Sequence, residues 1–174
     1  MDPTEESNRF PDDCLPPEGE YGSRDALYKA INEWAAPRGY GFVIARSRVT
    51  PSGRANVVFQ CDRGAGRTPA SSDKRQRQTT TRRTGCHFSV ITKESVDRST
   101  WRMSHRSGSG FDTHNHEPSF SQCAHPVHRQ LSTIDRSTVC NLANAGVAPK
   151  EIRSYLRNNS ETQATQQDIY NYLA

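Results

Sequence analysis

Apolar residues spaced three or four positions apart predict one helix near the start of the chain. Ser23 suits the position that caps such a helix, and Pro37 followed by Gly39 would end it. We therefore expect a helix over residues 24–36 with one buried stripe. The stripe consists of Ala26, Leu27, Ala30, Ile31 and Trp34.

The apolar pattern changes to a period of two after this helix, which predicts β-strands. Pro51-Ser-Gly53 separates the first two strands and favours a hairpin. Residues 62–84 are basic and almost free of apolar side chains, so we expect a long loop there. The predicted strands cover residues 40–49, 55–61, 86–92 and 101–105.

Helical spacing returns after Leu131 and predicts a second, all-α unit over residues 131–174 with a helix–turn–helix outline. Residues 120–130 are expected to be a linker. Residues 1–21 are rich in Pro, Asp, Glu and Ser, which predicts a disordered acidic tail. The fold class is therefore α+β. The positions expected to face the core of the helical unit are Ile134, Val139, Leu142, Ala145, Ile152, Tyr155, Leu156, Ile169, Tyr170 and Leu173.

The composition argues against one large apolar core. Hydrophobic residues make up 32% of the 174 residues, against about 45–50% in an ordinary globular chain when Gly is counted. Small folded pieces supported by a metal ion or by disulfides fit this composition better. We find no long apolar run and no basic, apolar leader at the start. We therefore expect no membrane partner, and cysteines that are mostly reduced.

The net charge of +4 is unevenly distributed along the chain. Residues 38–106 contain 15 Lys/Arg and 4 Asp/Glu, a net charge of +11, whereas residues 1–37 carry −6. A basic block of this size suits a polyanion such as nucleic acid. A solvated basic surface explains the charge equally well.

Two cysteines and two histidines form a candidate zinc site: Cys61, Cys86, His114 and His116. The two histidines are two positions apart, so on an extended backbone both imidazoles face the same side. Two thiolates and two imidazoles complete the tetrahedral shell of one Zn²⁺ ion. The 24 residues between the cysteines are unlike the short spacing of familiar zinc motifs. From spacing alone, four unrelated residues remain an alternative.

Five short motifs resemble one family of DNA-binding domains. They are Tyr40-Gly-Phe, Val58-Phe-Gln-Cys61-Asp-Arg-Gly, Thr84-Gly-Cys86-His-Phe, Trp101-Arg-Met and His114-Asn-His116-Glu. Residues 22–119 resemble the zinc-dependent domain of far-red-impaired-response proteins and Mutator-like transposases, within the WRKY and glial-cells-missing group. The resemblance implies a zinc-clipped antiparallel sheet of four or five strands. It also implies that Cys61, Cys86, His114 and His116 bind the single Zn²⁺ ion.

The resemblance further implies how such a domain meets DNA. Relatives insert one strand edge-on into the major groove, and the corresponding strand here carries Arg46 and Arg48. Arginine reads guanine through two hydrogen bonds. The W-R-K-Y-G-Q-K string of the plant factors is missing, so their target sequence does not carry over. The basic loop would contact phosphates or would stay solvated, through Lys74, Arg75, Arg77, Arg82 and Arg83.

We therefore expect zinc-dependent, sequence-preferring binding of double-stranded DNA in the nucleus, by a transcription regulator or a transposase-derived protein. Residues 131–174 weakly resemble the helical segment that precedes the catalytic core of Mutator-like transposases. The acidic residues of such a core are missing here, so we expect no enzyme activity. One alternative is an N-terminal fragment of an active Mutator-like transposase. Another is a protein-interaction module on a zinc scaffold, in which residues 131–174 form a homodimer or bind a protein partner.

Overall fold

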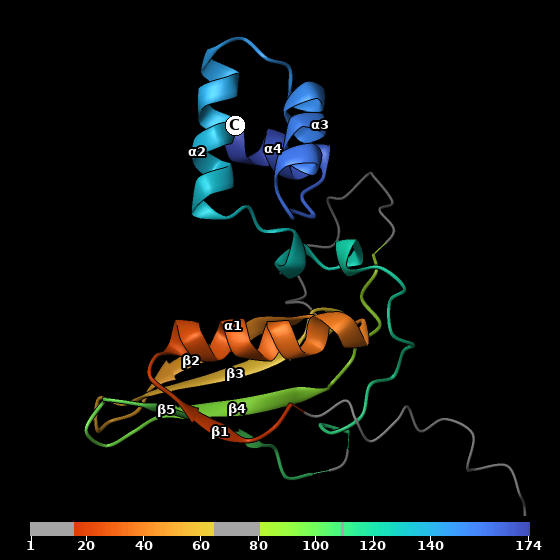
Figure 1. Ribbon diagram of the computed structural model, residues 1–174. Coiled ribbons are helices and arrows are strands. Elements are labelled where there is room, and N and C mark those ends of the chain that lie inside the picture. Colours follow the sequence, from red (N-terminus) through yellow and green to blue (C-terminus); the bar gives the residue numbers. More distant parts are fainter. Residues whose placement is uncertain (1–15, 65–80, 109) are drawn as a thin grey trace, which may run out of the picture. The chain divides into compact units, whose positions relative to one another are not determined.

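The computed structural model describes residues 16–64, 81–108 and 110–174. The chain divides into two compact units, Met1–Pro118 and Ser119–Ala174, which we call the sheet unit and the helical unit. An antiparallel sheet and a helix form the first, and helices form the second (Figure 1). This arrangement confirms the expected α+β class. Within the described residues, no helix is both long and apolar enough to cross a membrane.

Five antiparallel strands form the sheet in the order β1-β5-β4-β3-β2. β2 is therefore an edge strand, as the expected insertion of this strand into a groove requires. Three strands lie close to their predicted positions, and β4 begins three residues after the predicted start. The strands are β1 (Gly19–Tyr21), β2 (Phe42–Val49), β3 (Ala55–Cys61), β4 (Ser89–Glu94) and β5 (Trp101–His105).

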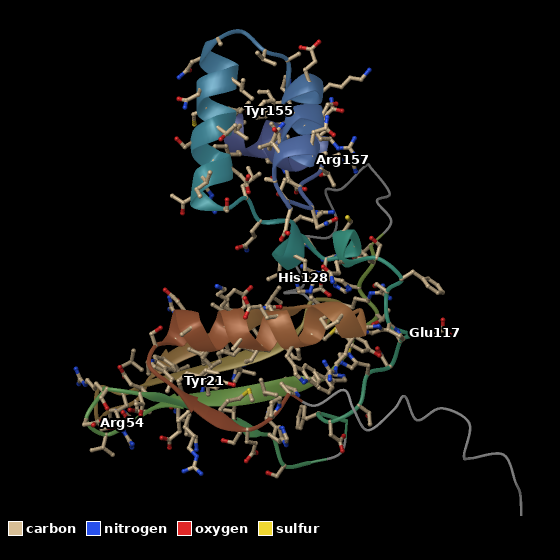
Figure 2. The ribbon with its side chains drawn as sticks, in the orientation of Figure 1. Tyr21, Arg54, Glu117, His128, Tyr155 and Arg157 are labelled. Carbon is tan, nitrogen blue, oxygen red and sulfur yellow. The ribbon has the colours of Figure 1, made fainter. Side chains whose placement is uncertain are left out.

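The prediction of a disordered tail over residues 1–21 is wrong at its carboxyl end, where residues 19–21 form the strand β1. Residues 19–21 pair with β5, with Gly19 opposite Met103 and Tyr21, which is labelled in Figure 2, opposite Trp101. Near this strand, the His105 ring lies 2.7 Å from the carbonyl oxygen of Pro16. Three paired residues are too short to produce a recognisable alternation, so only the partner strand identifies them. Residues 1–15 of the expected tail lie outside the described residues.

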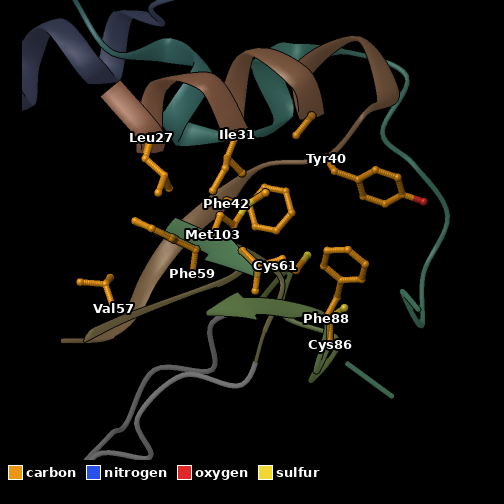
Figure 3. Close-up of a cluster of buried hydrophobic side chains, with 12 residues drawn as sticks. Leu27, Ile31, Tyr40, Phe42, Val57, Phe59, Cys61, Cys86, Phe88 and Met103 are labelled. Atoms are coloured by element: carbon orange, nitrogen blue, oxygen red, sulfur yellow. The ribbon is translucent and has the colours of Figure 1, made fainter. Parts of the chain in front are cut away.

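The helix α1 (Arg24–Ala35) lies across one face of the sheet (Figure 1). It ends one residue before its predicted end, and a short 3₁₀ turn, η2 (Ala36–Arg38), follows it. The Ser23 hydroxyl oxygen accepts a hydrogen bond from the Ala26 N–H at 3.0 Å and caps the helix, as predicted. Figure 3 shows the core between helix and sheet. Its buried members are Leu27, Ile31, Ala35, Tyr40, Phe42, Val57, Phe59, Cys61, Cys86, Phe88, Val90 and Met103.

A buried amide fixes α1 to the edge strand β2. The Asn32 side chain accepts a hydrogen bond from the Phe42 N–H at 2.8 Å and donates one to the Phe42 carbonyl at 3.3 Å. The Tyr28 hydroxyl donates to the same carbonyl at 3.1 Å. These bonds satisfy backbone groups at the start of β2 that would otherwise be buried without partners. The start of β2 is therefore held in one position beneath the helix.

The helical unit contains α2 (Thr133–Asn144), α3 (Pro149–Asn159) and α4 (Gln166–Leu173). Short 3₁₀ turns, η4 (Gln122–Ala124) and η5 (Pro126–Arg129), occupy the expected linker. Five predicted core positions are wrong, because Ile134, Ala145, Tyr155, Tyr170 and Leu173 are exposed, Ile134 to 78%. Ile134 lies in the first turn of α2, beside buried Asp135 of the capping box. The core consists of Leu131, Val139, Ile152, Leu156, Ala164 and Ile169.

Candidate metal centre

The structure brings together the four residues that the sequence predicts as zinc ligands. Cys61 ends β3, Cys86 lies just before β4, and the two histidines lie on the segment after β5. One ligand atom from each residue lies within 4.8 Å of the other three, and all four residues are buried. In Figure 3, Cys61 and Cys86 lie at the same end of the core as Tyr40 and Phe88. The cluster therefore joins three segments at one end of the sheet.

The distances within the cluster fit a tetrahedral ion. The Cys61 Sγ atom lies 3.2 Å from His116 Nε2, and Cys86 Sγ lies 3.5 Å from His114 Nδ1. Bond lengths of about 2.3 Å to sulfur and about 2.0 Å to nitrogen give a sulfur–nitrogen edge of roughly 3.5 Å in a tetrahedron. Two sulfur and two nitrogen donors in this geometry favour zinc. The residues present therefore fit one Zn²⁺ ion.

The environment of His116 selects its metal-binding nitrogen. The Nδ1 atom lies 2.9 Å from the carbonyl oxygen of Glu117. A carbonyl can only accept a hydrogen bond, so the proton belongs on Nδ1. The Nε2 atom, which faces Cys61, then carries the free lone pair that a metal requires.

Aromatic rings enclose the other histidine of the cluster, His114. The His114 ring stacks between Tyr40 and Phe88, with ring centroids 3.8 and 4.0 Å away and both planes within 10° of parallel. The His114 Nε2 atom is buried and has no hydrogen-bond partner within the described residues. Burial lowers the pKa of His114. The neutral imidazole, which is the form that binds metals, is therefore favoured.

The pKa values of the two thiols shift in opposite directions. The hydrogen bond from Cys61 lowers the pKa of Cys86 to about 2, and bonds with His114 and His116 act in the same direction. The same bond between the thiols, together with burial, raises the pKa of Cys61. A backbone N–H from Arg63 also lies 3.4 Å from Cys61 Sγ and stabilises negative charge there. The Cys86 thiolate thus lies beside the neutral imidazole of His114.

A surrounding layer of polar contacts positions the ligand segments. The Asn115 side chain, between the two histidines, donates to the Thr84 carbonyl at 3.0 Å and contacts its hydroxyl at 2.9 Å. The Thr84 and Cys86 N–H groups both donate to the Arg63 carbonyl, at 2.9 and 3.3 Å. The segments before and after residues 65–80 are therefore joined beside the cluster.

The other candidate ligands do not join this cluster. His87 is exposed, and His105 contacts Pro16 and Glu18 instead. The Cys123 thiol donates to Gln163 at 3.0 Å. Within the residues that the structure describes, Cys123, His125 and His128 do not form a group able to hold a metal ion.

The structure describes four of the seven residues predicted to contact DNA. Arg46 and Arg48 are exposed on the edge strand β2. Arg83 is exposed, whereas the Arg82 guanidinium donates to the buried Asp62 carboxylate at 2.9 Å. Asp62 follows Cys61 directly in the chain. The ion pair therefore gives Arg82 a structural role beside the cluster that the sequence did not indicate. Lys74, Arg75 and Arg77 lie outside the described residues.

Sequence reasoning missed several residues that build the site. Tyr40 stacks on His114, although 73 residues separate them, and no spacing rule links the two. Asn115 and Asp62 adjoin predicted ligands along the chain, and that proximity is the only signal that could have identified them. Their partners depend on tertiary structure.

The chain is similar to one segment of a much larger protein. It is 31% identical over 160 residues to the PKS-NRPS hybrid synthetase cheA of Chaetomium globosum. The match covers 89% of this chain but 3% of that protein. No family model and no solved structure matches the chain.

Proposed function

We propose that this chain binds double-stranded DNA through a sheet that one Zn²⁺ ion stabilises, and that it acts in the nucleus as a DNA-binding protein rather than as an enzyme. The proposal rests on the resemblance of residues 22–119 to zinc-dependent DNA-binding domains. One structural observation supports it most. The sheet with the buried Cys61–Cys86–His114–His116 cluster presents two exposed arginines on its edge strand.

The edge strand β2 suits direct contact with bases. Arg46 and Arg48 make no side-chain hydrogen bond or ion pair within the described residues, so their guanidinium groups are available to a partner. Both face the same side of the sheet, because they lie opposite Val58 and Asn56 of β3. A guanidinium that binds guanine in the major groove discriminates between base pairs by about 1–3 kcal/mol.

The zinc ion would act on DNA binding indirectly. The cluster joins the end of β3 to the start of β4 and to the segment after β5, so the ion would fix the sheet that positions β2. The ion need not touch DNA. Loss of the ion would disorganise the sheet and remove the rigid edge that a groove-reading strand needs.

A selection of binding sites from random duplex DNA, with the full chain, tests this proposal. We expect an enriched sequence when zinc is present, loss of binding in a chelator, and recovery when zinc is returned. The variant Arg46→Ala/Arg48→Ala should keep its zinc and its folded sheet but lose the sequence preference. No binding to duplex DNA, or binding that persists after zinc has been removed, would contradict the proposal.

A further inference from the structure

A row of polar and basic side chains crosses the sheet on the side opposite α1. The strand register places Arg48 beside Asn56, Asn56 beside Lys93, and Lys93 beside Arg102. A parallel row joins Arg46, Val58, Ile91 and Ser104. We call the side of the sheet that carries these two rows the open face. It holds four cations, Arg46, Arg48, Lys93 and Arg102, and one carboxylate, Glu20 of β1, which lies opposite Arg102. All five side chains are exposed.

A β-bulge places the two arginines of β2 on the open face. Ile44 pairs with Phe59 on the core side, but the next pair is Arg46 with Val58, so Ala45 is an extra residue. In a regular strand, Arg46 would have followed Phe42 and Ile44 to the side that carries α1. One inserted residue reverses the side on which the later side chains lie. The bulge therefore gathers all four cations on one face.

These four cations differ from most of the other described cations of the sheet unit. Lys29 pairs with Glu33, Arg82 with Asp62, and the Arg106 guanidinium donates to Ser89 and lies over the Phe111 ring. By contrast, the side chains of Lys93 and Arg102 make no ion pair or hydrogen bond within the part of the chain that is described. The unpaired positive charge is therefore concentrated where an anionic surface could dock.

The spacing of the strands relates the row to the shape of duplex DNA. Neighbouring strands lie about 4.8 Å apart, so β4 is about 10 Å from the edge strand β2. The major groove is about 8.5 Å deep. If β2 enters the groove edge-on and lies at its floor, Lys93 of β4 lies level with the phosphates at the groove's rim. Arg102 of β5 then lies one strand farther from the groove floor. A groove of about 420 Å³ beside Arg46 and Arg48 leaves these side chains accessible.

We propose that Lys93 and Arg102 bind the phosphate backbone along one wall of the major groove while Arg46 and Arg48 face the bases. This inference rests on the proposed function and assigns separate tasks to the two ends of the row. Contacts to phosphates position a protein without reading sequence. Lys93 and Arg102 therefore set affinity and its dependence on salt, and β2 sets sequence preference.

The test measures binding of the full, zinc-loaded chain to a labelled 20-base-pair duplex of arbitrary sequence between about 50 and 200 mM salt. The variant Lys93→Ala/Arg102→Ala should bind more weakly. Its negative slope of log affinity against log salt should be less steep by about 1.8, since each phosphate contact contributes about 0.9. The sites that this variant selects from random DNA should stay those of the wild type.

Two variants control for charge and for folding. Lys29→Ala removes one positive charge on α1, on the other face, and should leave the slope almost unchanged. Lys93→Arg/Arg102→Lys keeps both charges and should restore the wild-type slope. If the wild type binds duplex DNA and the double Ala variant has the same slope, Lys93 and Arg102 do not bind phosphates, and the proposed function stands.

Failure of the proposed function gives a different result. A wild-type chain that binds no duplex DNA, or that prefers double-stranded RNA of the same sequence, would overturn the proposed function and the inference with it. A changed site preference in the double Ala variant would overturn the division of tasks, because the two residues would then read bases.

Discussion

The sheet unit and the helical unit differ in how far apart along the chain their core residues lie. In the sheet unit, Gly19 pairs with Met103, and 24 residues separate the cysteines of the candidate metal centre. In the helical unit, the whole core lies between Leu131 and Ile169. Closing long loops costs conformational entropy before any contact is gained. The unit with the distant contacts is the one that contains a candidate metal centre.

The helical unit uses local devices instead. The Ser132 hydroxyl accepts a hydrogen bond from the Asp135 N–H at 3.0 Å, and the Asp135 carboxylate accepts one from the Ser132 N–H at 3.2 Å. Thr165 and Asp168 repeat this capping box at α4. The described residues of this unit contain no group able to hold a metal ion. The comparison teaches that metal ligands and caps stabilise different kinds of small core.

Removal of the metal should show the largest difference in stability between the two units. Structural zinc supplies about 10–16 kcal/mol in small zinc-binding peptides, which matches or exceeds the roughly 5–15 kcal/mol that stabilises a typical domain. With a chelator, we expect the sheet unit to lose its near-ultraviolet circular dichroism while the helical signal of the other unit persists. If the chelator changes the circular dichroism of neither unit, a metal ion does not stabilise the sheet unit and the proposed difference between the units is wrong.

Asn32→Ala should have the next largest effect, confined to the sheet unit. The substitution leaves the buried Phe42 N–H without the acceptor that Asn32 provides at 2.8 Å. An unsatisfied buried donor costs about 1–3 kcal/mol. Urea unfolding should show a loss of about 2 kcal/mol in the sheet transition with the metal present. An unchanged sheet transition would show that water replaces the amide and that Asn32 does not fix α1 to β2.

Ser132→Ala should weaken the helical unit alone. Removing a capping hydroxyl costs about 1 kcal/mol, and the capping box at α2 depends on this side chain. The helical transition should move to lower temperature while the zinc-dependent transition stays in place. Thr165→Ala at α4 is the matched variant and should act in the same direction. Equal shifts in both transitions would mean that the units do not unfold separately.

Glu33→Gln should have the smallest effect. Glu33 pairs with Lys29 on the exposed side of α1 at 3.6 Å. Exposed pairs of this spacing contribute about 0.3–0.5 kcal/mol. Urea unfolding should show a change below about 0.5 kcal/mol in the sheet unit. A larger loss would give this pair a structural role and would disqualify Lys29→Ala as a neutral control.

The sequence predicts the local features of both units well. Alternation located β2, β3 and β5, and the Ser23 cap located the start of α1, because these signals depend only on neighbouring residues. The approach of Cys61, Cys86, His114 and His116 was also predicted, and the structure confirms it as a cluster that could hold a metal ion. Spacing alone did not distinguish a zinc site from four unrelated residues, and the prediction of a zinc site relied on the resemblance to a zinc-dependent family.

Features that depend on distant partners could not be predicted. The three residues of β1 carry no pattern and exist as a strand because β5 offers its edge. The bulge at Ala45 leaves no mark in the sequence, although it decides which side Arg46 and Arg48 face. The stacking of Tyr40 on His114 and the pairing of Arg82 with Asp62 are likewise set by the folded chain.

Metal content tests the central claim most directly, because that claim is that one Zn²⁺ ion stabilises the sheet unit. We would measure zinc per chain by elemental analysis of the purified full chain, of Cys86→Ala, and of Cys123→Ala as the matched cysteine control in the helical unit. We predict one zinc ion in the wild type and in Cys123→Ala, and almost none in Cys86→Ala. A wild-type chain that folds without zinc, or a Cys86→Ala chain that keeps its full zinc content, would contradict the account.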